Sequence, residues 1–261
     1  MNGSAEAFAA GDITVRAADA ALAAAEPHLS GLGQPRFLGG YSNLLYKMEP
    51  FPVVARVAAA TGNVRPGTDW MAREVAVGQY LAARKAPAAR PSPLLPPGPH
   101  VRDGLALTFW EFAEISADAV GPEAAGAALR ALHDALAACA VALPALAGLA
   151  ETWRLLERPQ ILAQLGAPLR RTVEHAVRRV QSRLAGLTAP FRPLHGDAHH
   201  GNLWCVQGRP LWGDLEDAQG VRRNGIWPAS RRRRACSEAA PRRRRRSPAM
   251  ACPMTRNGSI S

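Results

Sequence analysis

The most constraining feature of this sequence is the polar stretch His195–Asn202, which reads HGDAHHGN. Asp197 is followed five positions later by Asn202, and a second acid, Asp214, comes twelve positions after Asn202. The apolar segment Pro210–Trp212 lies just before Asp214. This spacing predicts a loop and then a hairpin that ends near Asp214.

The residue types in this stretch suit phosphoryl transfer from a nucleotide. That chemistry needs a carboxylate beside the attacking hydroxyl, with an Asn and a second Asp to hold Mg²⁺. The protein-kinase pattern H-R-D-x-x-x-x-N, with D-F-G after a short hairpin, has the same spacing between its polar residues. We therefore hypothesise a small-molecule kinase.

Length and composition allow a sizeable buried core. The chain has 261 residues, of which 48% are hydrophobic, enough for one large domain or two lobes. No run approaches the roughly 18 uncharged apolar residues that a membrane helix requires. The Ala-rich N-terminus carries Glu6, Asp12 and Asp19 and lacks a basic start, so it does not resemble a secretory signal. We expect no membrane partner.

The four cysteines do not suggest a disulfide framework or a metal site. They form no C-x-x-C pair and no metal-ligand spacing. Reduced thiols and a cytoplasmic location are therefore expected.

The net charge of +11 is concentrated at one end of the chain. Residues 221–261 contain twelve Arg and a single acid, Glu238, whereas residues 1–220 hold equal numbers of basic and acidic side chains. A neutral globular body thus carries a basic tail. Binding of nucleic acid is not expected of the body, despite the high overall charge.

The order of the expected elements indicates an α+β fold. The N-terminal region should contain a helix over Ala17–Ala25, then a strand, a glycine-rich turn and a strand over Arg36–Met48, and a third strand over Pro52–Val57. Further elements are a helix over Thr68–Arg84, a proline-rich loop over Pro87–Pro99, a strand over Leu105–Phe112 and helices over Glu123–Ala142, Glu151–Leu165 and Leu169–Leu187.

Strands followed mainly by helices predict two lobes. We expect an N-lobe with a small antiparallel sheet at residues 1–112, a helical C-lobe at 113–220, and a disordered Arg-rich tail at 221–261.

Six motifs together resemble the aminoglycoside phosphotransferase and choline-kinase-like family, relatives of protein kinases. They come in the family's order across residues 37–220, and the His-Gly-Asp block with its downstream Asp is the most specific. The motifs are Gly39-Gly40-Tyr41-Ser42-Asn43, Val54-Ala55-Arg56-Val57, Arg73-Glu74-Val75, Leu129-Arg130-Ala131-Leu132-His133, the stretch 195–202 and Gly213-Asp214-Leu215-Glu216-Asp217.

The resemblance implies a two-lobed protein-kinase-like fold that uses ATP and Mg²⁺ and phosphorylates a hydroxyl of a small molecule. Asp197 would be the catalytic base, which accepts the proton of the acceptor hydroxyl. Asn202 and Asp214 would hold Mg²⁺ through oxygen atoms, the ligands that a hard cation prefers. His195 is expected to support the loop by hydrogen bonds. We expect no catalytic role for Glu216.

The nucleotide would bind the glycine-rich turn and a buried cation. Gly39 and Gly40 let backbone N–H groups approach the ATP phosphates, with Ser42 and Asn43 in the same turn. Arg56 lies among apolar strand residues, where an unpaired charge is costly.

Arg56 therefore needs partners, and the resemblance offers the phosphates and Glu74. The family often has Lys where this chain has Arg56, and a guanidinium keeps the charge and can grip a phosphate bidentately. The segment Trp110–Phe112 falls where the family's hinge contacts adenine.

Two other functions remain open at this point. Four potential metal ligands lie within six residues, as in a zinc-dependent hydrolase: His195, Asp197, His199 and His200. That hypothesis leaves Asn202 and Arg56 without roles. Alternatively, the Arg-rich tail binds nucleic acid, since Arg runs do bind phosphate backbones.

The tail also departs from the family. After its metal-binding Asp the family continues with Gly-Pro and then Trp-Asp-Leu-Ala, which opens a long helix. Residues 223–230 can be encoded by CGG AAT GGG ATC TGG CCA GCC TCG, and reading from the third base gives Glu-Trp-Asp-Leu-Ala-Ser-Leu. We hypothesise that residues from about Val221 onward are out of frame, and that loss of the C-terminal substrate region impairs this chain.

Overall fold

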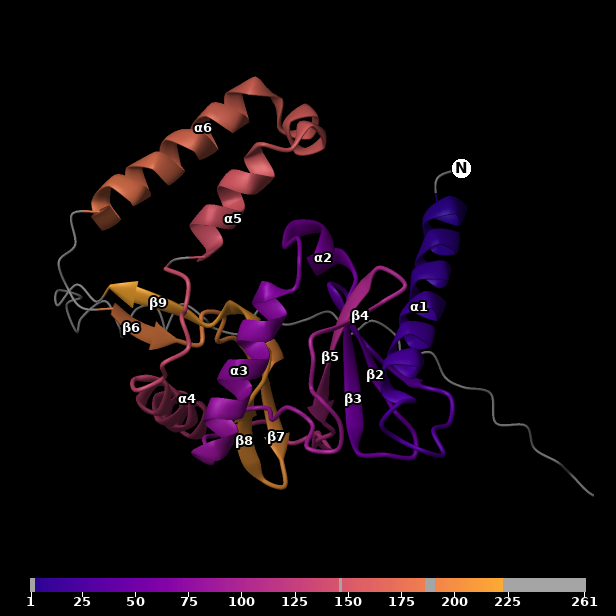
Figure 1. Ribbon diagram of the computed structural model, residues 1–261. Coiled ribbons are helices and arrows are strands. Elements are labelled where there is room, and N and C mark those ends of the chain that lie inside the picture. The colour runs from indigo at the N-terminus through magenta and orange to yellow at the C-terminus, as the bar shows by residue number, and fades with distance from the viewer. Residues whose placement is uncertain (1–2, 146, 186–190, 223–261) are drawn as a thin grey trace, which may run out of the picture. The chain divides into compact units, whose positions relative to one another are not determined.

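The structure, a computed structural model, describes residues 3–145, 147–185 and 191–222 (Figure 1). The chain divides into two units, Met1–Arg223 and Asn224–Ser261. All the elements below belong to the first unit. Apart from its first two residues, the Arg-rich tail predicted at 221–261 lies outside the described residues.

The N-terminal region is built on a five-stranded antiparallel sheet in the order β1-β2-β3-β5-β4. The strands predicted by alternation and β-branched content are confirmed, whereas the three-residue β4 was not predicted. The strands are β1 (Arg36–Gly39), β2 (Asn43–Lys47), β3 (Val53–Ala58), β4 (His100–Arg102) and β5 (Leu105–Glu111).

Helix α1 (Gly3–Ala25) packs on this sheet through alanines (Figure 1). Its small side chains are fully buried at Ala17, Ala21 and Ala24, which allows the helix and the sheet to approach closely. The Tyr46 hydroxyl of β2 donates to the Thr14 carbonyl oxygen at 2.7 Å. The helix predicted at 17–25 is therefore the C-terminal part of a longer helix.

Two helices follow β3. The short α2 (Ala60–Val64) was not predicted, and α3 (Asp69–Ala83) confirms the helix expected at 68–84. Helix α3 buries an apolar face that includes Met71, Val77 and Leu81, and the same face carries one acid, Glu74.

The proline-rich segment 87–99 is a loop that joins the sheet to a hairpin far along the chain. The N–H of Ala89 donates to the Trp212 oxygen at 2.8 Å, and the Trp212 N–H donates to the Pro87 oxygen at 3.0 Å. These backbone bonds fix the position of the segment directly before Asp214 relative to the sheet.

Three helices make up the middle of the chain: α4 (Pro122–Leu136), α5 (Ala147–Leu156) and α6 (Pro159–Ala185). The predicted extension of α4 to Ala142 is wrong. Beyond Leu136, the chain packs Val141 and Leu143 against a buried cluster, and the Pro144 oxygen accepts from the Gly220 N–H at 2.9 Å. Tertiary contacts therefore override helix propensity there.

The boundary between the next two helices also differs from the prediction. The chain breaks before Pro159, because a proline disfavours helical backbone at the preceding residue. The break expected after Leu165 appears instead as a kink inside α6, where Gly166 has φ 66° and Pro168 follows. Figure 1 shows α5 and α6 as a hairpin.

The C-terminal part of the first unit confirms the predicted loop and hairpin. A 3-10 turn, η1 (His200–Asn202), leads into β7 (Leu203–Val206) and β8 (Arg209–Trp212), paired from Leu203 with Trp212 onward. A second 3-10 turn, η2 (Leu215–Asp217), follows. Strands β6 (Phe191–Leu194) and β9 (Gln219–Arg222), which were not predicted, pair with each other and flank the hairpin in sequence.

A second buried cluster fixes this hairpin against the helices. It contains Val77 and Leu81 of α3, Leu132 of α4, Trp212 of β8 and Leu215 of η2. The antiparallel sheet with helices after it confirms the α+β class. Among the described residues, no helix is long and apolar enough to span a membrane.

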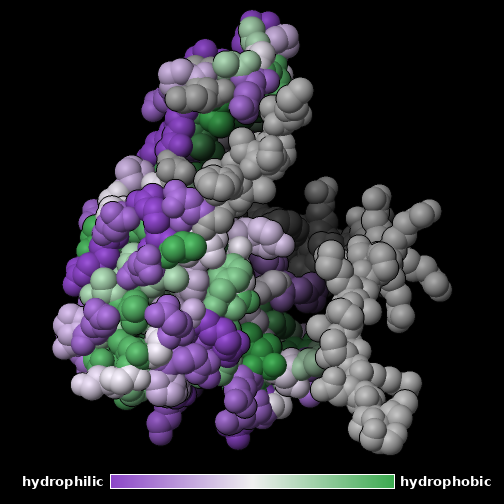
Figure 2. Space-filling view, turned by 90° about the vertical axis from the view of Figure 1, so that its right-hand side faces the viewer, coloured by the Kyte–Doolittle hydropathy of each residue, from purple (hydrophilic) through white to green (hydrophobic). Residues whose placement is uncertain are grey.

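The hairpin of α5 and α6 buries little of its own surface. Among the α6 side chains that the structure describes, Val177 is buried, whereas Leu169 and Val180 are exposed. Figure 2 shows hydrophobic residues between the hydrophilic ones at the top of the view, where these helices lie in Figure 1. The core of the molecule therefore lies at the five-stranded sheet and in the cluster formed by α3, α4 and the β7–β8 hairpin.

Candidate active site

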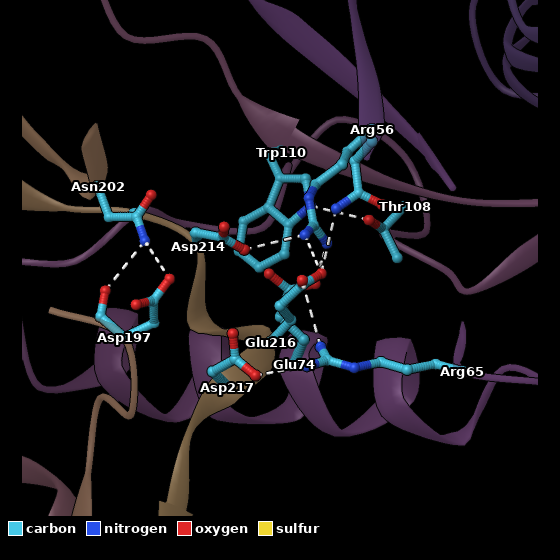
Figure 3. A network of polar contacts seen from close by, with 12 residues as sticks. Arg56, Arg65, Glu74, Thr108, Trp110, Asp197, Asn202, Asp214, Glu216 and Asp217 are labelled. Carbon is cyan, nitrogen blue, oxygen red and sulfur yellow. Dashed lines mark hydrogen bonds and ion pairs between the residues drawn. The ribbon is translucent and has the colours of Figure 1, made fainter. Parts of the chain in front are cut away.

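The site is centred on Arg56, whose side chain is only 9% exposed (Figure 3). Its Nη1 donates to Glu74 Oε2 at 2.6 Å, and its Nη2 donates to Asp214 Oδ1 at 2.9 Å and also to Glu216 Oε2. The predicted ion pair between Arg56 and Glu74 is confirmed. Two further carboxylates share the same guanidinium.

Three elements bring these groups together. Strand β3 carries Arg56 opposite Leu45 of β2 and Thr108 of β5. Helix α3 supplies Glu74 from its buried face, and the end of the β7–β8 hairpin supplies Asp214. Asp214 has a left-handed backbone, with φ 56°, which Asp tolerates better than most residues.

Burial and mutual attraction act in opposite directions on this cluster. Burial lowers the pKa of Arg56, but Glu74, Glu216 and Asp214 outweigh it and raise that pKa above its ordinary value. Burial raises the pKa of the Glu74 carboxyl more than Arg56 lowers it. The guanidinium therefore stays charged, whereas ionisation of the buried Glu74 carboxyl is unfavourable compared with ionisation in water.

A second arginine, Arg65, extends the network. Its Nε donates to Glu151 Oε1 at 2.6 Å, its Nη1 lies 3.2 Å from Glu216 Oε1, and its Nη2 donates to Asp217. Arg65 was not predicted as a site residue, and Glu216 was expected to have no catalytic role. No local pattern signals either residue, because the partners lie 86 and more than 150 positions away in the chain.

The glycine-rich turn between β1 and β2 reaches the same network through Asn43. Asn43 Nδ2 donates to Glu216 Oε2 at 3.2 Å. Gly40 has φ 120°, and a Cβ there would lie 2.0 Å from the Asn43 oxygen, so the turn requires glycine. The Ser42 oxygen accepts from the N–H groups of Ala59 and Thr61.

The turn has an open tip. A Cβ at Gly39 would meet no atom within 4 Å, and the Tyr41 side chain next to the glycines is 98% exposed. The structure thus joins Asn43 to the site through a hydrogen bond, and places Gly39, Gly40 and Ser42 in the turn that leads to it.

His195 supports the loop of Asp197, as predicted. Its Nε2 donates to the Gly213 oxygen at 2.8 Å, so its Nδ1 is an acceptor, and the Asp197 N–H lies 3.4 Å from it. The His195 N–H donates in turn to His133 Nε2 of α4 at 3.1 Å. Burial lowers the pKa of both histidines, which keeps them neutral.

Asp197 projects from this supported loop with its side chain 49% exposed. Asn202 Nδ2 donates to its backbone oxygen at 3.0 Å and to its Oδ2 at 3.3 Å. Gly196 has φ 92°, and a Cβ there would lie 1.8 Å from the Asp217 oxygen. Glycine at this position therefore lets the loop of Asp197 pack against the end of η2.

The side-chain oxygen atoms of Asn202 and Asp214 are of the kind that suits a divalent cation. Asn202 uses its amide nitrogen for Asp197, which leaves its amide oxygen as a ligand of the kind Mg²⁺ prefers. Burial, followed by the nearby carboxylates Glu216, Asp217 and Asp197, raises the pKa of Asp214 to about 6 despite Arg56. A cation would relieve that repulsion.

The geometry does not assemble the alternative hydrolase site. His195 is buried and bonded to Gly213, and His199 Nε2 lies 3.3 Å from Asp197 Oδ2. Within the described ranges, no group of three or more His, Cys, Asp or Glu side chains is placed to hold a metal ion. The zinc hypothesis gains no support.

The segment expected to contact adenine is occupied by the protein's own contacts. Trp110 is buried, and its Nε1 donates to Thr108 Oγ1 at 2.9 Å. The N–H groups of Glu111 and Phe112 donate to the backbone oxygens of Arg90 and Pro52. The Trp110 side chain is therefore part of the core.

The raised pKa of Asp214 gives a prediction for stability. The folded protein binds a proton at Asp214 more tightly than the unfolded chain, whose Asp pKa is the ordinary 3.8, so the metal-free fold loses stability as pH rises through about 6. Asp214→Asn removes that loss, worth about 1 kcal/mol after screening of a partly exposed side chain.

We expect Asp214→Asn to unfold at higher denaturant concentration than the wild type at about pH 7.5 without divalent cations, with the difference vanishing near pH 4. Denaturant titrations at the two pH values measure this. Equal or lower stability of the variant at the higher pH contradicts it.

Comparison with known proteins gives a consistent family. The sequence profile described as the phosphotransferase enzyme family matches residues 35–215. A comparison with curated protein sequences gives no significant match.

Among similar solved structures is an amicoumacin kinase in complex with AMP-PNP and Ca²⁺, at 16% identity and a TM-score of 0.58, covering 81% of this chain and 68% of that one. A choline kinase from Streptococcus pneumoniae has 15% identity and a TM-score of 0.51, covering 72% and 65%. A mutant aminoglycoside 2'-phosphotransferase-IIIa in complex with GDP has 15% identity and a TM-score of 0.50, covering 77% and 71%.

At these identities the similarity establishes the fold, which is protein-kinase-like. The chain spans 65% of the length of the choline kinase. The profile match covers more than half of the chain and contains Arg56, Asp197, Asn202 and Asp214. This chain belongs to the phosphotransferase enzyme family.

Proposed function

We propose that this chain derives from an enzyme that moves the γ-phosphoryl group of ATP to a hydroxyl of a small molecule. The observation that carries the proposal is the shared guanidinium of Arg56, which contacts Glu74 and Asp214 while Asp197 and Asn202 lie bonded to each other nearby. This reaction needs a buried cationic side chain, two candidate metal ligands and an exposed carboxylate, and the site contains all of these groups.

Asp197 is proposed as the catalytic base. Asn202 holds its carboxylate by one oxygen, and the side chain is half exposed, so an acceptor hydroxyl can reach it. In this reaction the transition state is loose, and alignment of the hydroxyl with the phosphorus matters more than a strongly shifted pKa. Asp197 would accept the hydroxyl proton as the bond to phosphorus forms and the bond to ADP breaks.

Asn202 and Asp214 are proposed to hold Mg²⁺. The ion, when bound, would neutralise charge on the phosphate oxygens. The surplus of acid at the site supports a cation, because Arg56 and Arg65 contact five carboxylates between them: Glu74, Glu151, Asp214, Glu216 and Asp217.

The nucleotide phosphates are proposed to lie between the glycine-rich turn and Arg56. Gly39, Gly40, Ser42 and Asn43 form a turn with an open tip, and Asn43 is tied to the network around Arg56. Glu74 would keep the guanidinium in place while it exchanges Asp214 for phosphate oxygens. Fold does not decide the acceptor, so we propose only a hydroxylated small molecule.

The organisation of the chain is part of the proposal. We propose an N-lobe at residues 1–112, a C-lobe at 113–220 and an out-of-frame tail from about Val221, in a protein of the cytoplasm. The family profile ends at residue 215, shortly before the tail begins. The exposed Leu169 and Val180 on α6 are apolar positions that a longer C-lobe would cover.

The nucleotide sequence of the gene tests the frame hypothesis. Codons that spell Glu-Trp-Asp-Leu-Ala in another frame across residues 223–230 are expected. Codons that cannot spell it would contradict the hypothesis.

The proposed reaction is tested by Asp197→Asn. In protein whose reading frame is restored after residue 220, we expect ATP-dependent phosphorylation of some hydroxylated acceptor, detected by coupled ADP release. Loss of the base should slow it by roughly 10²–10⁴-fold, with ATP affinity nearly unchanged. The 261-residue chain itself should be much less active.

Asp134→Asn is the matched control, because Asp134 lies on the exposed face of α4 with its side chain 71% exposed. It should retain activity. Equal activity of Asp197→Asn and the wild type would contradict the proposed role of Asp197 as catalytic base. Loss of ATP binding in that variant would indicate that Asp197 has a different role.

A further inference from the structure

Arg65 lies outside the predicted nucleotide and metal residues, yet it is among the most highly connected side chains of the site. It follows α2, and its side chain is 12% exposed. Its Nε and Nη2 form a fork on the two carboxylate oxygens of Glu151 in α5, at 2.6 and 3.2 Å. The same guanidinium contacts Glu216 and Asp217 of η2.

Glu216 connects the two arginines. Its Oε1 lies 3.2 Å from Arg65 Nη1, an ion-pair contact without hydrogen-bond geometry, and its Oε2 accepts from Arg56 and from Asn43 of the glycine-rich turn. The Glu216 side chain is only 10% exposed, so these partners rather than water hold its orientation. Both guanidinium groups also lie against the ring of Trp70, at 5.7 and 5.8 Å from its centroid.

We propose that Arg65 is a positioning residue that holds one oxygen of Glu216, so that Glu216 takes only part of the Arg56 guanidinium. This inference rests on the proposed function, because the group kept available is the part of Arg56 that would meet the ATP phosphates. Arg65 acts on Arg56 through Glu216, which contacts both guanidinium groups.

The physical reason is the geometry of carboxylate pairing. An arginine and a carboxylate prefer a two-oxygen fork, which is stronger than a single contact. With Arg65 in place, Glu216 has one oxygen for each arginine. Without Arg65, Glu216 can turn both oxygens onto Arg56, and the guanidinium would then be less free to exchange its partners for phosphate.

Removal of Arg65 also raises the local negative charge. Glu216 and Asp217 would lose a cation while Asp214 stays close to Glu216, since both of these acids contact Arg56 Nη2. Repulsion should loosen the segment 213–218, which carries Asp214. Two measurable effects follow: faster amide exchange in that segment and weaker binding of nucleotide.

The test compares Arg65→Met, which keeps the apolar stem, with Arg65→Lys, Glu151→Gln and a control, Arg130→Met. Arg130 forms a helical ion pair on the surface, with its side chain 82% exposed. The two readouts, on the full chain, are hydrogen–deuterium exchange of residues 213–218 without ligand and affinity for ATP with Mg²⁺. Circular dichroism checks that each variant is folded.

We expect Arg65→Met to speed exchange in 213–218 and to weaken ATP affinity about tenfold, a typical coupling between neighbours in one ion-pair network. Arg65→Lys should recover part of the affinity because it keeps one charged contact with Glu216. Glu151→Gln should have a smaller effect than Arg65→Met, because the glutamine oxygen can still accept from Arg65 and Glu216 keeps its contact with Arg65. Arg130→Met should leave both readouts within about twofold.

Unchanged exchange in Arg65→Met overturns the inference. Faster exchange with unchanged ATP affinity also overturns it, because Arg65 would then be only structural. If Glu151→Gln reproduces Arg65→Met, the arginine acts through α5 and not through Glu216, again against the inference. If the wild type binds no nucleotide, but Arg65→Met still exchanges faster than the wild type in 213–218, the proposed function is overturned. The link from Arg65 to phosphate is then overturned with it.

Discussion

The site depends on the burial of one charge, Arg56. A guanidinium among apolar strand residues has lost most of its water and is tolerated only when carboxylates surround it. Glu74, Asp214 and Glu216 meet that need. Because Glu74 comes from α3 and the other two come from the segment that ends the β7–β8 hairpin and forms η2, pairing of a single strand residue fixes where two distant segments must lie.

The same pairing leaves the site overcharged. Carboxylates outnumber the arginines that hold them, and burial with like-charge repulsion raises the pKa of Asp214. The protein can tolerate this repulsion because α3, α4 and the β7–β8 hairpin pack together in a hydrophobic cluster that includes Trp212 and Leu215. A cation would relieve the repulsion, and this would link the energetics of the fold to the metal-dependent reaction proposed for it.

Much of this arrangement could be predicted where the pattern is local. The spacing of Asp197, Asn202 and Asp214 predicts the loop and hairpin. A lone Arg in an apolar strand requires a partner, and the family resemblance supplied Glu74 as that partner. Arg65 and the role of Glu216 could not be predicted, because their contacts join segments far apart in the chain. The early end of α4 was also missed, since it depends on the packing of Val141 and Leu143 against a buried cluster and on the hydrogen bond between Pro144 and Gly220 of β9.

The most direct measurement is a crystal structure of the chain with Mg²⁺ and a non-hydrolysable ATP analogue. We expect a metal ion bound by Asn202 Oδ1 and Asp214, with Asp214 released from Arg56 and Arg56 turned toward the phosphates while still paired with Glu74. A nucleotide bound elsewhere, or one bound while Arg56 keeps Asp214 and no metal lies beside Asn202, would contradict it.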